Sequence, residues 1–155
     1  MPKQQSQRVK HVFRAKNIIC CTPAYIQKYG LLTSIDDLAK HKVVTSIFQD
    51  NTICQTAYIF NDDTDEIVKK IMVPTNIATN DFGFNKLMID SGEVIGAYNE
   101  AYIRDELASG KLIRLLPGIH LGYLDIFLLR NIDEKDQRYQ KFWAFLKASL
   151  DPLRL

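Results

Sequence analysis

A short polar segment, Thr79-Asn80-Asp81, stands between an alternating strand pattern and an amphipathic helix pattern, and it offers the clearest chemistry in the sequence. A strand–helix junction of this kind leaves backbone N–H groups without intrahelical partners, at the positive end of the helix dipole. Threonine and asparagine side chains beside those groups suit a small anion, and Phe82 could supply an apolar wall. The alternative is that the segment only caps a buried helix.

The carboxylate of Asp81 fits a helix cap better than a ligand contact. A carboxylate that faced an anionic ligand would repel it, whereas the Thr79 hydroxyl and the Asn80 amide can donate hydrogen bonds to it. The sequence therefore predicts different roles for neighbouring residues: Asp81 holds the helix, and Thr79 and Asn80 meet the ligand.

The histidines and cysteines are the other residues with reactive side chains. The three histidines fall in different predicted elements, and no Cys/His pair has the spacing of a metal site. One cysteine, Cys21, directly precedes a predicted helix, where a thiol pKa can be lowered. The favoured interpretation is that the cysteines pack as small core residues in a reducing compartment. These residues are His11, His41, His120, Cys20, Cys21 and Cys54.

No sequence motif indicates an enzyme. A P-loop, GxGxxG, GxSxG and HExxH are all absent from the sequence. The paired acids Asp36-Asp37 and Asp105-Glu106 fit solvated helix surfaces. The acid cluster at residues 61–65 resembles half of a calcium loop, but it lacks the spaced glycine and the closing glutamate, so we expect a hairpin turn there. We predict no catalytic residue, no metal and no cofactor.

Composition limits the class of protein. The sequence has 155 residues, of which 46% are hydrophobic and 25% charged, with a formal net charge of +2. This length suits one domain or two small lobes, and the weak, dispersed charge does not predict a nucleic-acid groove. No apolar run is long enough for a membrane span, and the first residues have no apolar signal-peptide core. We expect a cytoplasmic protein.

Short strand and helix patterns alternate along the sequence, which predicts an α/β fold. The strand at 123–129 is apolar almost throughout, so we expect burial on both of its faces. An aromatic stripe on the last helix indicates core packing. The predicted strands are 9–21, 42–46, 56–60, 66–78 with an interruption at Pro74, 94–97, 111–116 and 123–129. The predicted helices are 23–29, 35–40, 82–91, 100–109 and 134–150, and the stripe is Tyr139, Phe142, Trp143, Leu146 and Leu150.

Three segments, in the same order and at matching spacings, resemble LysR-type transcriptional regulators. The first is similar to that family's passage Ser-Pro-Ala-Tyr-Leu … Pro-Asp-Asp-Leu … His, and the second to its Asn-Asp-Gly junction before a helix. The third resembles Leu-Ala-Ser-Gly-Arg-Leu-Val-Arg-Val-Leu nearly residue for residue. Here they read Ile19-Cys20-Cys21-Thr22-Pro23-Ala24-Tyr25-Ile26 with Ser34-Ile35-Asp36-Asp37-Leu38-Ala39-Lys40-His41, then Asn80-Asp81, then Leu107-Ala108-Ser109-Gly110-Lys111-Leu112-Ile113-Arg114-Leu115-Leu116-Pro117.

The resemblance implies the C-terminal effector-binding (substrate-binding) domain of such a regulator. That domain has a fold similar to type 2 periplasmic binding proteins: two α/β lobes are joined by two crossing strands, and a small effector binds between them. Residues 1–19 would hold the first crossover, 20–117 the second lobe, and 118–155 the returning strand and the last helix of the first lobe.

The resemblance also implies a site. Thr79, Asn80, Asp81 and Phe82 match the family's cleft, and Thr22 and Thr45 are further candidates for contacts with the effector. The partners implied are a small, carboxylate-like effector and further copies of the chain in an oligomer. DNA would bind only through a helix-turn-helix outside these residues, and no membrane partner is implied.

The sequence departs from the family pattern in three respects. It has no counterpart of the helix-turn-helix, the linker helix or the first βαβ units of lobe one. Val94 stands where the family usually has glycine, and Asn99 where it usually has proline. Without the first units, the strand at 123–129 and the last helix would expose an apolar patch. We therefore expect the chain either to self-associate or to be part of a longer protein.

The favoured function is the effector-binding portion of a LysR-type regulator, which senses a small, anionic metabolite between two lobes and couples binding to oligomer geometry. The alternative is a free-standing solute-binding or interaction module that lacks DNA binding and pairs with intact regulators. An enzyme is the least favoured of the three hypotheses, because the sequence shows no evident nucleophile–base pair.

Overall fold

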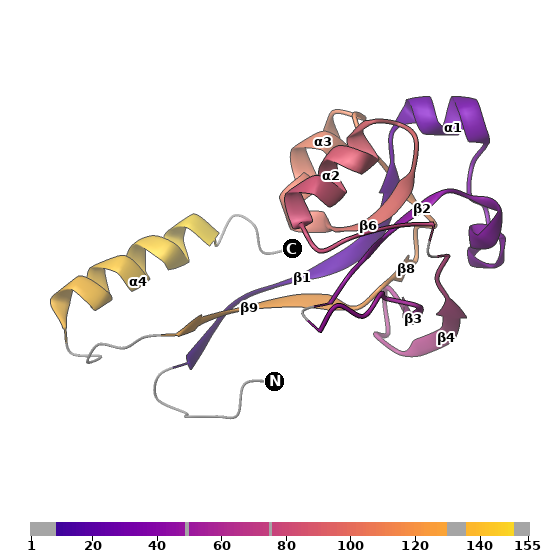
Figure 1. The fold of residues 1–155 in the computed structure, drawn as a ribbon. Coiled ribbons are helices and arrows are strands. Elements are labelled where there is room, and N and C mark those ends of the chain that lie inside the picture. Colours follow the sequence, from indigo (N-terminus) through magenta and orange to yellow (C-terminus); the bar gives the residue numbers. More distant parts are fainter. Residues whose placement is uncertain (1–8, 49, 75, 130–135, 151–155) are drawn as a thin grey trace. The chain divides into compact units, whose positions relative to one another are not determined.

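The structure, a computed structural model, describes residues 9–48, 50–74, 76–129 and 136–150. The chain forms two compact units: unit 1 is Met1–Ala15 with Tyr123–Leu155, and unit 2 is Lys16–Gly122 (Figure 1). Strands and helices alternate along the chain, as the sequence predicts. No helix in the described ranges is long and apolar enough to cross a membrane.

Unit 2 is built on a sheet whose strands lie in the order β5-β2-β6-β1-β7. Strand β2 pairs in parallel with both β5 and β6, whereas β1 is antiparallel to β6 and β7. The carboxyl ends of β5, β2 and β6 therefore meet at one edge of the sheet. The strands are β1 Val9–Cys21, β2 Val43–Ser46, β5 Ile77–Thr79, β6 Ile95–Asn99 and β7 Ile113–Leu115.

Five short helices and a second sheet complete unit 2. The second sheet has the strand order β4-β3-β8, and β3 and β4 form an antiparallel hairpin. The helices are α1 Pro23–Tyr29, η1 Ile35–Lys40, α2 Phe82–Asp90, η2 Glu100–Ile103 and α3 Arg104–Ala108, where η denotes a 3₁₀ helix; the strands are β3 Thr56–Asn61, β4 Ile67–Met72 and β8 Ile119–His120.

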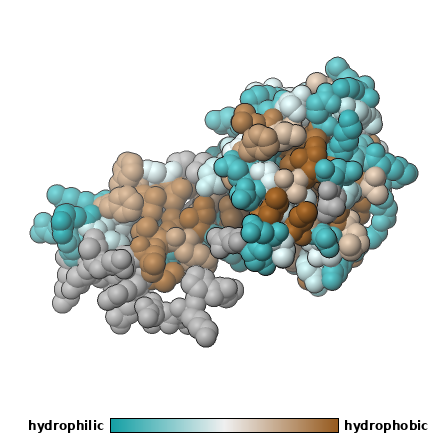
Figure 2. Space-filling view, in the orientation of Figure 1, coloured by the Kyte–Doolittle hydropathy of each residue, from teal (hydrophilic) through white to brown (hydrophobic). Residues whose placement is uncertain are grey.

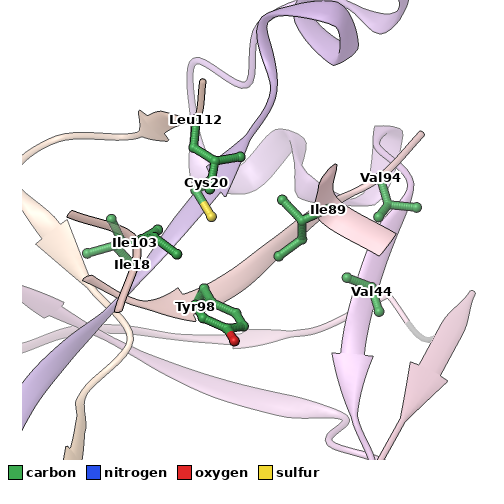
Figure 3. Packing of buried hydrophobic residues seen from close by; sticks show 8 residues of the cluster. All are labelled: Ile18, Cys20, Val44, Ile89, Val94, Tyr98, Ile103 and Leu112. Atoms are coloured by element: carbon green, nitrogen blue, oxygen red, sulfur yellow. The ribbon is translucent and has the colours of Figure 1, made fainter. Parts of the chain in front are cut away.

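Apolar clusters cover both faces of the main sheet, because successive strand residues point to opposite faces. Ile18 and Cys20 of β1 pack with Val44 of β2 and Ile89 of α2 on one face (Figure 3). Their neighbours in β1 and β2 pack on the other face with residues of α1 and η1; this second cluster includes Ile19, Cys21, Val43, Tyr25 and Leu38. Helix α2 therefore lies on one face, and α1 and η1 lie on the other.

Helix α2 approaches the sheet closely at Gly96 of β6. A Cβ atom at this position would lie 2.7 Å from Val44 Cγ1 and 2.8 Å from Ile89 Cδ1. Such distances are well inside van der Waals contact, so only glycine allows Ile89 to pack this deeply against the strand.

Charged side chains connect the two sheets of unit 2. Asp62, in the turn after β3, binds Lys16 of β1 at 3.0 Å and Arg114 of β7 at 2.7 Å. Arg114 also binds Glu100 at 3.0 Å and donates to the carbonyl oxygen of Ile119 at 2.9 Å. Burial alone would raise the pKa of Asp62, but the hydrogen bond from Lys16 and the charge of Arg114 lower it below its ordinary value.

Unit 1 contains the beginning of β1, strand β9 (Tyr123–Leu129) and helix α4 (Gln137–Leu150). Strand β9 pairs with β1. Across this pair, the carboxylate of Asp125 accepts hydrogen bonds from Arg14 Nε at 2.8 Å and lies 2.7 Å from His11 Nε2. Lys10 of β1 lies over the ring of Trp143 in α4, 4.9 Å from its centroid.

The two predictions about burial in unit 1 are wrong in part. Strand β9 is not buried on both faces: the exposed fractions of Phe127 and Leu129 are 43% and 68%. In α4, Tyr139 is buried as expected, but Phe142 is half exposed because it lies about 60° around the helix from Tyr139. Apolar side chains therefore remain on the surface of unit 1 (Figure 2).

Most predicted elements occur, with some changes at their ends. The predicted strands 9–21 and 123–129 and the helix 23–29 have the bounds that the structure shows. The predicted helix 100–109 is divided into η2 and α3, and the predicted strand 66–78 is divided into β4 and β5. The second division falls at Pro74, which has no N–H group to donate to a sheet.

We expect Gly96→Ala to lower the free energy of unfolding by about 1–3 kcal/mol, because the new methyl group collides with Val44 and Ile89. Urea denaturation followed by circular dichroism measures this change. Gly83→Ala in the first turn of α2 is the matched control, since its Cβ would meet only Asp81 Oδ1, at 3.3 Å. The control should change stability by less than about 1 kcal/mol, and equal losses in both variants would contradict the close packing at Gly96.

The pH dependence of unit 1 tests the Asp125 contacts. Hydrogen bonds from Arg14 and then His11 lower the pKa of Asp125 from 3.8 to about 2. A depressed folded-state pKa contributes stability above the unfolded pKa, and this contribution is lost as the pH falls from about 4 to about 2. The urea midpoint, read from the fluorescence of the single tryptophan Trp143, should therefore be lower in Asp125→Asn than in the unmodified protein near pH 5. The difference should disappear near pH 2; a difference that stays constant would show that Asp125 does not stabilise unit 1 in this way.

Candidate functional site

Thr79 lies at the carboxyl edge of the parallel strands, as the last residue of β5. It is in register with Ser46, the last residue of β2, so the two hydroxyl-bearing side chains lie on the same face of the sheet. Val44 and Ile77 precede Ser46 and Thr79 by two residues and are also paired with each other. Both pack in the apolar cluster under α2. The Thr79–Ser46 pair is therefore on the α2 face, where the sheet ends and the helix begins.

Asp81 caps α2, as the sequence predicts. Its side chain accepts a hydrogen bond from the Phe84 N–H at 2.5 Å, and its carbonyl oxygen accepts one from the Asn85 N–H at 3.0 Å. The Thr79 hydroxyl oxygen in turn accepts a hydrogen bond from the Asp81 N–H at 3.1 Å. Helix geometry leaves the first-turn N–H groups of Phe82 and Gly83 without an intrahelical acceptor. The junction thus has two free backbone donors, together with the Thr79 hydroxyl proton and the exposed amide of Asn80.

An aromatic group stands next to these donors. The Phe82 ring stacks on Tyr98 of β6, with centroids 4.2 Å apart and planes inclined at 25°. The edge of Tyr102 faces Phe82 at 6.1 Å. Tyr98 is buried and Phe82 is 48% exposed, so one side of Phe82 is fixed while the ring remains accessible. A planar apolar ligand could contact it there.

Three residues at this junction, Ser46, Tyr98 and Tyr102, are not among the site residues predicted from the sequence. Alternation along β6 would have placed Tyr98 on the same face as Gly96, and alternation along β2 would have placed Ser46 on the face of Val44. The alternation within each strand does not show that β2 and β6 are adjacent, parallel strands. The order of the strands in the sheet cannot be read from the spacing of residues along the chain.

Thr45 and Thr22 do not lie with Thr79 and Asn80. Thr45 precedes Ser46 in β2, so it points to the opposite face of the sheet, where its hydroxyl donates to the carbonyl oxygen of Cys54 at 3.2 Å. Thr22 follows β1, which is antiparallel to β6, and therefore lies at the other edge of the sheet. There it caps α1 by accepting a hydrogen bond from the Tyr25 N–H at 3.2 Å.

A reactive thiol at Cys21 was an open alternative, and the structure shows the opposite effect on its pKa. Cys21 is fully buried, and burial raises the pKa of its thiol to about 11. Burial likewise raises the pKa of Cys20 to about 12. Both thiols are protonated near neutral pH and pack as small core residues, which agrees with the other interpretation of the cysteines.

The histidines occupy separate places and face different partners. His41 Nδ1 lies 3.0 Å from the Tyr25 hydroxyl, and buried His120 has its Nε2 3.0 Å from a carboxylate oxygen of Asp65. Within the described ranges, no three or more His, Cys, Asp or Glu side chains are grouped so that they could hold a metal ion. At the junction at the end of β5, the described polar groups are the Thr79 hydroxyl, the Asn80 amide and the first-turn N–H groups of α2, all of which can donate hydrogen bonds.

Solved structures with a similar fold include the regulatory domains of transcriptional regulators. The regulatory domain of AphB from Vibrio vulnificus matches 94% of this chain and 70% of its own length, with a TM-score of 0.72 and 20% sequence identity. The regulatory domain of CrgA, a LysR-type transcriptional regulator from Neisseria meningitidis, matches 95% of this chain and 72% of its own length, with a TM-score of 0.70 and 19% identity.

Full-length regulators match as well. The chain spans about half of full-length AphB from Vibrio cholerae, 49% of that chain, with a TM-score of 0.73 and 18% identity. No protein-family model matches the sequence, and no curated protein matches it. At these identities the similarity establishes the fold. This chain has the α/β, type 2 periplasmic-binding-protein-like fold of LysR-type regulatory domains.

Proposed function

We propose that this chain is a ligand-sensing portion of a LysR-type transcriptional regulator, and that its ligand binds at the junction between β5 and α2. The fold supports this proposal, as does the passage at 107–117, which resembles the family nearly residue for residue. The observation that carries it is the grouping of free backbone donors, Thr79, Asn80 and the exposed Phe82 ring at the carboxyl edge of parallel strands. In open α/β sheets, ligands bind at this edge.

The proposed ligand is a small molecule with a carboxylate or a similar anion and a flat apolar part. The anion would accept hydrogen bonds from the Phe82 and Gly83 N–H groups, the Thr79 hydroxyl and the Asn80 amide. The apolar part would lie on Phe82, which Tyr98 supports from behind. The Asp81 carboxylate is bound to the Phe84 N–H and stabilises the helix, so an anionic ligand has to approach beside it. Thr22 and Thr45 have structural roles in this proposal.

A second proposal keeps the sensing role and changes the biological context. The chain could act as a free-standing binding module that pairs with intact regulators, whereas DNA binding requires a helix-turn-helix. Reading the coding DNA on the 5′ side of Met1 distinguishes the regulator from the separate module: an in-frame helix-turn-helix supports the regulator, and a stop codon supports the separate module.

We propose no enzymatic activity, because the described cysteines nearest a helix start are buried and protonated, and the histidines face tyrosine or carboxylate partners.

A thermal-shift screen of small aromatic and aliphatic carboxylates tests the proposed site. A ligand that binds only the folded protein raises the melting temperature by mass action. Thr79→Ala and Asn80→Ala should each weaken binding about tenfold or more, because each removes a hydrogen bond to a charged group. Asn80 is exposed, so Asn80→Ala should change the unliganded melting temperature little. Thr79→Ala also removes the hydrogen bond from the Asp81 N–H and should lower it modestly, so each ligand shift is measured from the variant's own unliganded melting temperature.

The matched control is Thr22→Ala, a loss of the same hydroxyl at the other edge of the sheet. It removes the α1 cap and should lower the free energy of unfolding by about 1 kcal/mol, while ligand affinity stays the same. If the shift persists in both Thr79→Ala and Asn80→Ala, the ligand binds elsewhere and the proposal is wrong. Loss of the shift in Thr22→Ala alone would place the ligand at the amino ends of β2 and β6.

We also propose that the chain self-associates through unit 1. Phe142 and Phe145 on α4 are 50% and 67% exposed, and Phe127 and Leu129 on β9 are exposed as well. An apolar surface of this kind favours contact with a second copy. Light scattering should give a mass above one chain, 17.8 kDa, and the double change Phe142→Ser and Phe145→Ser should shift it toward one chain. A single-chain mass for the unmodified protein at about 100 μM would contradict this proposal.

A further inference from the structure

A cavity of about 500 Å³ lies within unit 2, away from the residues of the β5–α2 junction. It is open to solvent on one side, and three segments border it: the loop 33–35 before η1, the β3–β4 hairpin with Ile59 and Val68, and the connection 116–119 between β7 and β8. Neither Thr79 nor Phe82 lines it. Its volume is in the range of cavities that bind small molecules.

Backbone hydrogen bonds fix the walls of this cavity. In the strand pairing of β3 with β8, Asn61 is in register with Ile119. On the opposite wall, the Asp37 N–H donates to the Ser34 carbonyl oxygen at 3.0 Å, which holds the start of η1. Because these bonds are independent of any occupant, the cavity does not need a ligand to form.

The interior of the cavity is mainly apolar. Ile59, 1% exposed, belongs to the protein core, and Ile35, Val68, Leu116 and Ile119 contribute further aliphatic surface. None of the described residues that line it is aromatic. Aliphatic walls suit an apolar chain, which gains free energy when its methylene groups leave water.

Lys69 is the charged residue among those that line the cavity. Its ammonium group pairs with Asp36, the residue after Ile35, so the ion pair joins two of the walls. The side chains of Lys69 and Asp36 are 42% and 69% exposed, and an exposed pair of this kind contributes little to stability. The ammonium group can therefore exchange Asp36 for the anionic group of a ligand at little cost. The hydroxyl groups of Thr33 and Ser34 stand at the same wall and can donate further hydrogen bonds.

We propose that this cavity is a second ligand site, which binds a small aliphatic carboxylate. The apolar chain lies against Ile35, Val68 and Ile119, with Ile59 beneath them, and the carboxylate binds Lys69 at the η1 side. This ligand differs from the flat anion proposed for the β5–α2 junction, and the two sites share no residue.

Octanoate is a suitable probe, and 1-octanol and octylammonium are its matched neutral and cationic forms. Titration of the ¹⁵N-labelled full chain with octanoate should give saturable amide shifts at residues 33–35, 68–69, 116, 118 and 119. Lys69→Met keeps the aliphatic stem and removes the charge, so it should weaken octanoate about tenfold and leave octanol unchanged. Val68→Glu places a carboxylate at an exposed position in the wall and should abolish octanoate binding.

Lys70→Met is the control on the same strand. The Lys70 ammonium lies over the Tyr58 ring, 5.5 Å from its centroid, and Lys70 does not line the cavity. Octanoate affinity should therefore be unchanged in this variant. The proposal is overturned if octanoate gives no saturable shift, if Lys69→Met and Lys70→Met weaken it equally, or if octylammonium binds as well as octanoate. Shifts confined to residues 79–83 that disappear in Thr79→Ala would also overturn it, because octanoate would then bind only at the β5–α2 junction.

Discussion

The close contact between α2 and the main sheet at Gly96 determines where the polar chemistry of unit 2 is placed. Ile89 near the end of α2 packs where a Cβ of residue 96 would stand, with Val44 on its other side. This contact holds the last turn of α2 on β6 and β2, while the Asp81 cap holds the first turn at the end of β5. With both ends fixed, the free N–H groups of the first turn stay at the carboxyl edge, beside Thr79 and Phe82. A larger residue at 96 would move the donors along with the helix.

The proposed anion site lies directly beside the N–H group that the Asp81 cap uses. Asp81 already satisfies the Phe84 N–H and adds a negative charge close to the two remaining donors. This charge lowers the affinity for any anion, so the Thr79 hydroxyl and the Asn80 amide have to compensate. The stacked pair of Phe82 and Tyr98 adds an apolar contribution that does not depend on charge. A ligand with a single anionic group and a flat ring uses both contributions, and a highly charged ligand would be repelled by Asp81.

The sequence was sufficient for local structure and insufficient for the grouping of side chains. Thr22-Pro23 and Gly30 determine α1 from residue types alone, because an N-cap, a proline in the first turn and a glycine with φ near +86° are local signals. Asp81 was recognised as a cap for the same reason. Thr45 and Thr22 could not be separated from Thr79 in this way, since their positions depend on which face and which edge of the sheet each strand presents. These follow from the parallel pairing of β2 with β5 and the antiparallel direction of β1, which are long-range contacts. The exposure of Phe142 and of β9 also depends on which elements pack around them.

The charged group around Asp62 and Arg114 explains how one small unit can hold the two proposed binding surfaces apart. Lys16 and Arg114 belong to strands of the main sheet, and Asp62 belongs to the turn of the β3–β4 hairpin. Arg114 also holds the Ile119 carbonyl oxygen, and Ile119 lines the aliphatic cavity. All three charged side chains are about one-fifth to one-quarter exposed, so their attraction is screened less than that of a surface pair. Loss of one partner would leave the others partly buried and unpaired, which is more costly than the loss of an exposed contact. The second sheet is thereby held against the first, so the cavity walls keep their shape without contributions from the β5–α2 junction.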